Sequence, residues 1–169
     1  MPDDPGKCAV FAAGACIWSP GNPRAGWAFC YGADGLRNPL SYEGPVRAKG
    51  PATSQAQLNS RAELHAVVAA LKFRKWSAEG FHTLVIVTDS FYVVNGATAQ
   101  IKTWLQTGWK SPHRPGQTVL DQDLWETLLE EIKCLKGEGM AVEFWRIALH
   151  WNMASDAAVK AALSRNDTT

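Results

Sequence analysis

The sequence predicts an α/β fold in which helices flank a five-stranded mixed sheet. The first observation is the order of the patterns, which is strand, strand, strand, helix, strand, helices, strand, helix. The second is the continuous apolar and β-branched run at 83–88, which is typical of a strand buried on both faces. A helical pattern precedes this run, so the run should pair in parallel with an earlier strand. We therefore expect three antiparallel strands followed by two parallel strands.

The first three strands are separated by turn residues. Small and apolar residues predict strands at 8–17 and 26–31, with Pro, Gly and Asn between them. A third strand near 42–49 is expected at an edge of the sheet, because Pro39 and Pro45 cannot donate hydrogen bonds to a neighbouring strand. Together these runs predict an antiparallel meander.

A helix from Ser60 to Ala78 is predicted by a 3.6-residue apolar period, and Gly80 should end it. The apolar face of this helix comprises Leu64, Val67, Val68 and Leu71. The start rests on a capping-box pattern, in which the side chains of Ser60 and Glu63 each accept a hydrogen bond from a free backbone N–H.

The second half of the chain is predicted to be mainly helical. Short helices are expected at 90–95 and 98–106, and a long amphipathic helix at 121–137. The inward residues of the long helix are Leu124, Leu128, Ile132 and Leu135. A fifth strand at 141–147 and a last helix at 153–163 complete the order.

The chain of 169 residues, with 46% hydrophobic and 20% charged content, matches one globular domain. We expect an N-terminal extension at 1–7, the domain at 8–164 and a disordered tail at 165–169. The formal net charge is only +1, so recognition of a nucleic acid has to come from local patches.

The cysteines and the N-terminus indicate a location inside the cell. The four cysteines, Cys8, Cys16, Cys30 and Cys134, form no C-x-x-C pair, and we expect buried, reduced thiols. The first residues carry no signal-peptide pattern, and no stretch approaches the roughly 18 apolar residues of a membrane span. We expect a soluble protein of the cytoplasm or nucleus, neither secreted nor bound to a membrane.

Three acidic residues stand at positions that suit a two-metal nuclease. Asp89 ends the buried run, Glu63 opens a predicted helix and Asp156 opens another, while Ala13 closes the first strand. Hydrolysis of a phosphodiester is assisted by two Mg²⁺ ions ~4 Å apart, which are held by carboxylates. Each acid also has a structural explanation, because acids and Asp-Ser pairs are common at helix N-termini.

The motifs resemble those of the ribonuclease H family over roughly residues 8–164. The resemblance rests on Phe-Ala-Ala-Gly-Ala-Cys at 11–16, Asn-Ser-Arg-Ala-Glu-Leu at 59–64, Thr-Asp-Ser-Phe-Tyr-Val at 88–93, and the closing segment with Asn152 and Asp156. This closing segment is similar to fungal variants of the family. The resemblance implies the RNase H-like fold and hydrolysis of the RNA strand of RNA–DNA hybrids.

The resemblance also implies roles for the acids. Glu63 and Asp89 would hold one Mg²⁺ and Asp156 the other, with Mn²⁺ as a substitute. Ala13 occupies the position of the aspartate that bridges both ions, so this form should be nearly inactive. The mobile histidine of the family stands ten residues before the last aspartate, where this chain has Arg146, and His150 is a weak replacement. Phe91 replaces an amide that contacts the minor groove in relatives.

Nucleic-acid contacts are expected from two regions. No acid occurs between Asp89 and Asp121, a segment that contains Lys102, Lys110, His113 and Arg114 and that forms a basic protrusion in the family. Trp104, in the same segment, is interpreted as a core residue. Asn59 and Ser60 are candidates for contacts with 2′-hydroxyl groups, although Asn59 also fits a turn or cap.

Three hypotheses remain from the sequence. The first is a hybrid ribonuclease with two Mg²⁺ ions, provided that position 13 carries aspartate. The second is a catalytically inactive module that binds nucleic acid as an adaptor or scaffold. The third is a related metal-dependent nuclease that acts on another duplex. Protein partners and oligomeric state do not follow from these motifs.

Overall fold

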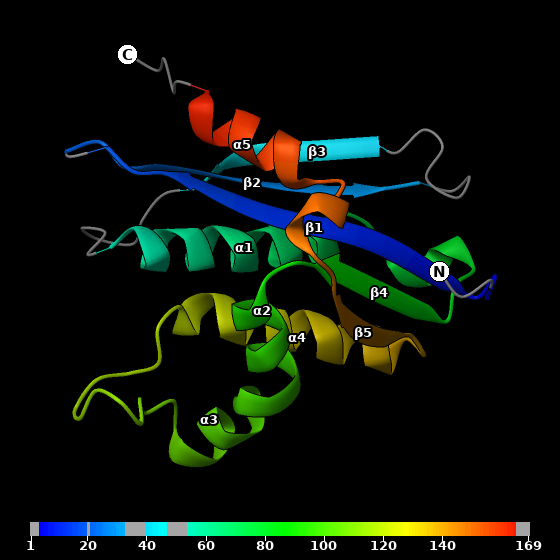
Figure 1. Ribbon diagram of the computed structural model, residues 1–169. Coiled ribbons are helices and arrows are strands. Elements are labelled where there is room, and N and C mark those ends of the chain that lie inside the picture. The colour runs from blue at the N-terminus through cyan, green and yellow to red at the C-terminus, as the bar shows by residue number, and fades with distance from the viewer. Residues whose placement is uncertain (1–3, 20, 33–39, 47–53, 165–169) are drawn as a thin grey trace.

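The computed structural model describes residues 4–19, 21–32, 40–46 and 54–164, and their centre is a five-stranded mixed sheet of order β3-β2-β1-β4-β5 (Figure 1). Its strands are β1 (Lys7–Ile17), β2 (Arg24–Tyr31), β3 (Leu40–Val46), β4 (Thr83–Thr88) and β5 (Ala141–Arg146). β1, β2 and β3 form the antiparallel meander, and β4 and β5 run parallel to β1. The predicted arrangement of the sheet is therefore confirmed.

The predicted strands differ from the observed ones mainly at their ends. β1 begins at Lys7, which pairs with Thr83, and the Lys7 ammonium contacts the Glu143 carboxylate at 3.0 Å. β3 lies at the sheet edge and contains Pro45, as predicted, whereas Pro39 lies outside the described residues. Residues 47–49 of the expected third strand, residues 1–3 of the expected N-terminal extension (1–7) and the expected tail (165–169) lie outside the described residues.

The first helix, α1 (Gln55–Lys72), begins five residues before the predicted start at Ser60. Its N-cap is Ser54, whose hydroxyl accepts a hydrogen bond from the Gln57 backbone N–H at 3.1 Å. The capping-box interpretation is wrong, because Ser60 and Glu63 lie well inside the helix. The first turn of α1, residues 55–57, is mainly exposed and carries no large apolar residue, so the spacing of apolar residues did not reveal where the helix begins.

The C-terminal end of α1 was also predicted wrongly. α1 ends at Lys72, and a separate 3₁₀ turn, η1 (Trp76–Glu79), follows it. The buried Trp76 belongs to this turn, which Gly80 closes with φ 87°. The apolar face of α1 is buried as predicted.

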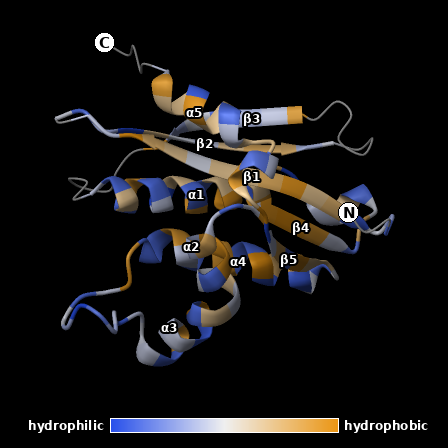
Figure 2. Ribbon diagram, viewed as in Figure 1, coloured by the Kyte–Doolittle hydropathy of each residue, from blue (hydrophilic) through white to orange (hydrophobic). Residues whose placement is uncertain are grey.

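Helices cover both faces of the sheet (Figure 1). α1 and α4 (Gln122–Gly137) lie on one face, and α5 (Ser155–Leu163) lies on the other, against β1, β2 and β3. α5 packs closely because Gly26 of β2 has no side chain: an added Cβ would lie 2.4 Å from the Ala162 backbone N. β1 and β4, between these layers, are largely hydrophobic (Figure 2).

Two short helices follow β4, close to the predicted positions. α2 (Phe91–Asn95) continues through a π-helical turn, η2 (Gly96–Gln100), into α3 (Ile101–Thr107). Trp104 is 7% exposed, which confirms its assignment to the core. A three-residue 3₁₀ turn, η3 (Leu149–Trp151), joins β5 to α5.

The four cysteines are free, but they are not all buried. Cys8 and Cys30 are buried, and burial raises the pKa of each thiol to about 11. Cys134 is exposed on α4, so the expectation of a buried thiol is wrong there. Among the helices that the structure describes, none is both long and apolar enough to cross a membrane.

Candidate active site

Glu63 is placed beside the central strand by a close contact between α1 and β1. A Cβ added at Gly14 would lie 2.2 Å from the backbone N of Glu63, so only glycine allows this approach. Gly14 follows Ala13 in the strand that pairs with β4. The contact therefore brings Glu63 to the part of the sheet where β4 ends at Thr88.

Both carboxylate oxygens of Glu63 accept hydrogen bonds. Asn59 Nδ2 donates to Oε1 at 2.8 Å, and the Ser90 hydroxyl donates to Oε2. The pKa of Glu63 is raised above its ordinary value, chiefly by burial. The hydrogen bonds from Ser90 and Asn59 lower this pKa, whereas the negative charge of Asp89 raises it further. The two carboxylates are therefore close enough for the charge of Asp89 to affect the ionisation of Glu63.

Asp89 directly follows β4, and its carboxylate is held by a buried amide. Asn152 Nδ2 donates to Asp89 Oδ1 at 2.6 Å and to the Ala12 carbonyl oxygen at 2.9 Å. The cap of α2 is Ser90, whose hydroxyl accepts a hydrogen bond from Val93 N at 3.1 Å. Asp89 itself is not the side chain that caps the helix, so the N-cap explanation applies only to Ser90.

Ala13 lies inside β1 and does not close it, because the strand continues to Ile17. Its side chain is 3% exposed and belongs to an apolar cluster whose other members include Val87, Ala154 and Ala158. The strand continues because β2 still pairs with it at Cys16 and Ile17, after the pairing with β4 has ended. A methyl group in this position can bind neither a metal ion nor water.

Asp156 lies in the first turn of α5, as predicted, and its side chain is exposed. Within residues 4–19, 21–32, 40–46 and 54–164, no three His, Cys, Asp or Glu side chains are grouped so that they could hold a metal ion. The structure therefore brings together Glu63 and Asp89 but adds no third ligand. Carboxylates suit a hard divalent cation, yet this arrangement does not fit a complete two-ion site.

The other predicted residues lie on separate elements. His150 is exposed in η3, with its ring centroid 5.2 Å from that of Trp151. Lys110 and His113 are exposed in the loop after α3. Arg114 of the same loop donates to Gln117 Oε1 and to the Thr118 carbonyl oxygen, both at 2.8 Å, so it also holds the loop together. Ser60 is partly exposed in α1.

Sequence reasoning missed the side chains that orient the two acids. Ser90 was interpreted as part of a cap, Asn59 as a substrate contact and Asn152 only as a motif residue. The signals were present, because Asn59 stands four residues before Glu63, which is one helical turn, and Ser90 follows Asp89 directly. Only the fold shows that Asn152 reaches Asp89 and β1.

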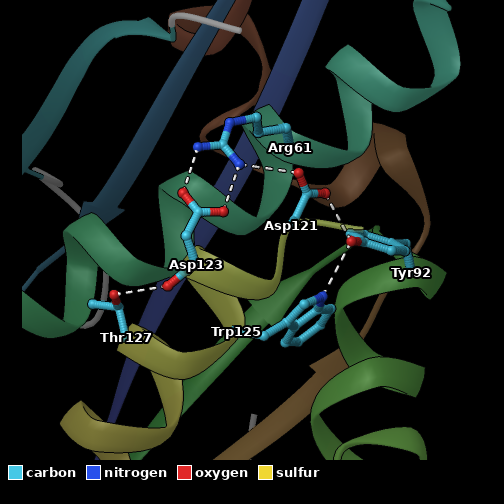
Figure 3. A network of polar contacts seen from close by, with 6 residues as sticks. All are labelled: Arg61, Tyr92, Asp121, Asp123, Trp125 and Thr127. Carbon is cyan, nitrogen blue, oxygen red and sulfur yellow. Dashed lines mark hydrogen bonds and ion pairs between the residues drawn. The ribbon is translucent and has the colours of Figure 1, made fainter. Parts of the chain in front are cut away.

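A second polar network supports α1 next to the site (Figure 3). Arg61 contacts Asp121 at 3.1 Å and Asp123 at 2.8 Å, Tyr92 donates to Asp121 at 2.8 Å, and Trp125 Nε1 donates to Tyr92 at 3.1 Å. The two aspartates raise the pKa of Arg61, chiefly through its hydrogen bonds with Asp123. The network joins α1, α2 and α4, and Arg61 is two residues from Glu63.

The sequence and the fold are similar to those of known proteins. The family model described as RNase H matches residues 5–162. The chain belongs to the RNase H family. It is 32% identical to a ribonuclease H of Treponema pallidum subsp. pallidum over 172 residues, which cover 94% of each chain. It is 34% identical to a ribonuclease H of a Cyanothece species over 119 residues, which cover 70% of this chain and 66% of that relative.

Solved structures of the RNase H fold superpose on this RNase H domain. LC9-RNase H1, a type 1 RNase H with the type 2 active-site motif, has a TM-score of 0.63 and 27% identity, and the match covers 93% of this chain and 72% of that chain. LC11-RNase H1, in complex with RNA/DNA hybrid, has a TM-score of 0.56 and 16% identity, with coverage of 92% and 96%. By family, the protein is a ribonuclease H-type hydrolase, and the family comprises RNA–DNA hybrid ribonucleases that generally depend on divalent metal ions.

Proposed function

We propose that this RNase H domain recognises RNA–DNA hybrids and, with alanine at position 13, hydrolyses their RNA strand only very slowly. The observation that carries the proposal is the burial of Ala13 in an apolar cluster, at the place where the family resemblance expects a metal-bridging aspartate. The loss of one charged ligand from a two-ion site removes several kcal/mol of transition-state stabilisation. That loss corresponds to a rate reduction of about 100-fold or more.

The remaining acids keep the chemistry that a hard cation requires. In the proposal Glu63 and Asp89 would hold one Mg²⁺ ion, for which Mn²⁺ substitutes, whereas the exposed Asp156 would have to approach this pair to hold a second ion. A bound ion would supply activation of water and neutralisation of phosphate charge. The contribution of the chain itself is to orient the oxygens: Asn59 and Ser90 fix the Glu63 carboxylate, and Asn152 fixes that of Asp89.

Substrate contacts in the proposal come from two surfaces. Asn59 and Ser60, next to Glu63 on α1, contact 2′-hydroxyl groups of the RNA strand. Lys110, His113 and Arg114 contact backbone phosphates from the loop after α3, where the positive charges are exposed or partly exposed. The first surface would distinguish RNA from DNA, and the second would supply affinity that decreases with salt.

The direct test is the restoration of aspartate at position 13. Ala13→Asp should increase cleavage of a labelled RNA–DNA hybrid by at least about 100-fold in Mg²⁺ or Mn²⁺. Ala13→Asn is the matched control, because it has nearly the same size but no charge, and it should cleave no faster than the parent chain. A folded Ala13→Asp protein that binds the hybrid without any gain in cleavage would contradict the hydrolase part of the proposal.

A binding module without catalytic activity is the second candidate function. It is favoured by one observation: both oxygens of Glu63 already accept hydrogen bonds within the chain. If the chain is such a module, the parent protein should bind the hybrid, and the Ala13→Asp variant should bind it without cleaving it. A comparison of hybrid with double-stranded RNA and double-stranded DNA tests the substrate, because equal affinity for all three would exclude hybrid-specific recognition.

A further inference from the structure

An exposed aromatic ring and an arginine lie together beside Asp89. Phe91, the first residue of α2, is 59% exposed, and the guanidinium carbon of Arg146 lies 5.2 Å from its ring centroid. Arg146 is the last residue of β5, where it pairs with Thr88. Arg146 Nε also donates a long hydrogen bond, 3.5 Å, to the Asp89 carbonyl oxygen. The ring and the carbonyl oxygen hold the guanidinium next to the candidate site.

These two contacts leave the positive charge of Arg146 available. A ring face and a carbonyl oxygen orient a guanidinium, but neither carries a full negative charge. Arginine remains protonated at every pH at which proteins are folded, so Arg146 cannot serve as the proton relay that a histidine provides. A fixed, exposed cation beside a nucleic-acid site is suited to contact with a phosphate group.

The segment that links Arg146 to Asn152 carries two large, exposed apolar side chains. Leu149 is 62% exposed and Trp151 is 69% exposed, both in η3, which begins three residues after Arg146 at the end of β5. Asn152, the next residue, contacts Asp89, so this exposed segment borders the site. Exposed aromatic side chains near an arginine are the features by which proteins hold a nucleic-acid backbone without reading its sequence.

We propose that Arg146 and Phe91 together form a phosphate-binding contact for the backbone of the nucleic acid beside Asp89. Arg146 supplies the charge, and the Phe91 ring fixes the guanidinium plane and packs against the adjoining sugar. The contact requires no metal ion, so it operates when the site cannot assemble two ions. The inference deepens the proposed function, since it rests on binding of a hybrid by this domain.

The test is the salt dependence of hybrid affinity in EDTA. Arg146→Gln should bind the hybrid about tenfold more weakly at low salt, because one charged hydrogen-bonded contact is lost. The slope of log K against log salt should decrease in magnitude by about 0.9, the value of one phosphate contact. Arg146→Lys should keep the slope and lose part of the affinity, because lysine cannot stack on the ring.

Phe91→Leu isolates the role of the ring, because it keeps an apolar side chain without a π face. It should weaken binding about threefold and leave the salt slope unchanged. Lys75→Gln is the control for loss of a surface charge, since Lys75 is exposed before β4, at the end of that strand away from Asp89. Its slope should equal that of the parent chain.

The outcomes separate this inference from the proposed function. A parent chain that binds hybrid, together with an Arg146→Gln protein of the same affinity and slope, would overturn the phosphate contact alone. An equal decrease in slope for Lys75→Gln would also overturn it, because the effect would then come from net charge. A parent chain that binds no hybrid would overturn the proposed function and this contact together. Thermal unfolding of each variant confirms that the fold is retained.

Discussion

Asn152 donates a hydrogen bond from its buried side-chain amide to the carboxylate of Asp89 at 2.6 Å. The same amide donates to the Ala12 carbonyl oxygen at 2.9 Å, so one side chain joins the segment before α5 to the end of β4 and to β1. The orientation of Asp89 therefore depends on packing of the last helix. Damage to that packing should affect the site as well as the stability.

Replacement of Asn152 should destabilise the protein. Asn152→Ala removes the donor to the buried Ala12 carbonyl oxygen and to one oxygen of the partly buried Asp89, and an unsatisfied buried acceptor costs about 1–3 kcal/mol. The free energy of unfolding from urea titrations measures this loss. Asn22→Ala, at an exposed position, is the control and should change stability by under about 0.5 kcal/mol. Equal losses for the two variants would show that the hydrogen bonds of Asn152 contribute nothing specific.

Aspartate at position 13 should make the thermal stability dependent on metal ions. Without ions, Ala13→Asp buries a carboxylate in an apolar cluster and should lower Tm. Addition of Mg²⁺ should raise Tm of this variant by several degrees, because a ligand that binds only the folded state stabilises it. Ala13→Asn should show no such increase. An Ala13→Asp protein whose Tm does not respond to Mg²⁺ or Mn²⁺ would argue against an ion site there.

The stability contribution of Glu63 should depend on pH in a defined direction. Burial raises the pKa of Glu63 above its ordinary value of 4.5. The folded state then retains a proton that the unfolded state has lost, so this contribution to stability decreases as pH rises from about 4.5 through the raised value. Glu63→Gln removes the titration.

Unfolding of both proteins at several pH values tests this relationship. The unfolding free energy of the parent chain minus that of Glu63→Gln should decrease as pH rises from about 4.5 through the raised pKa of Glu63. A difference that stays constant, or that changes in the opposite direction, would mean that the pKa of Glu63 is not raised in the folded chain.

The network around Arg61 should be more stabilising than an exposed ion pair. Arg61→Met leaves Asp121, whose side chain is 12% exposed, without its cation, and the expected cost is about 3 kcal/mol. Lys160→Met is the control, because Lys160 is 79% exposed and lies 3.7 Å from Glu43. It should cost under about 1 kcal/mol. Urea denaturation measures the loss of unfolding free energy in both variants. If both losses are under about 1 kcal/mol, the Arg61 network does not stabilise α1 more than an exposed ion pair would.

The loop after α3 should contribute to salt-dependent binding. Lys110→Ala should reduce the slope of log K against log salt by about 0.9 and leave Tm unchanged, because its side chain is exposed. Arg114→Ala should also lower Tm slightly, since its two hydrogen bonds within the loop are lost. An unchanged slope for Lys110→Ala would place this residue outside the nucleic-acid interface.

The sequence by itself determined the order of elements, the mixed sheet, the buried run at 83–88 and the family. These features follow from local residue patterns or from general rules of strand pairing. They can be predicted correctly even when the predicted ends of a helix or strand are wrong by a few residues. The sequence could not give the start of α1, because its first turn is polar and Ser60 offers a plausible competing cap. That error made Glu63 look like a capping residue, although it lies inside the helix.

Only the tertiary structure decided which side chains meet. Gly14 allows α1 to approach β1 and brings Glu63 next to Asp89, whereas Asp156, at the start of α5, remains exposed. The contacts of Asn152 with Ala12 and Asp89 and the pairing of Arg146 with Phe91 also join segments far apart in the chain. Such contacts depend on packing distances between layers, and a one-dimensional pattern of residue types does not contain those distances.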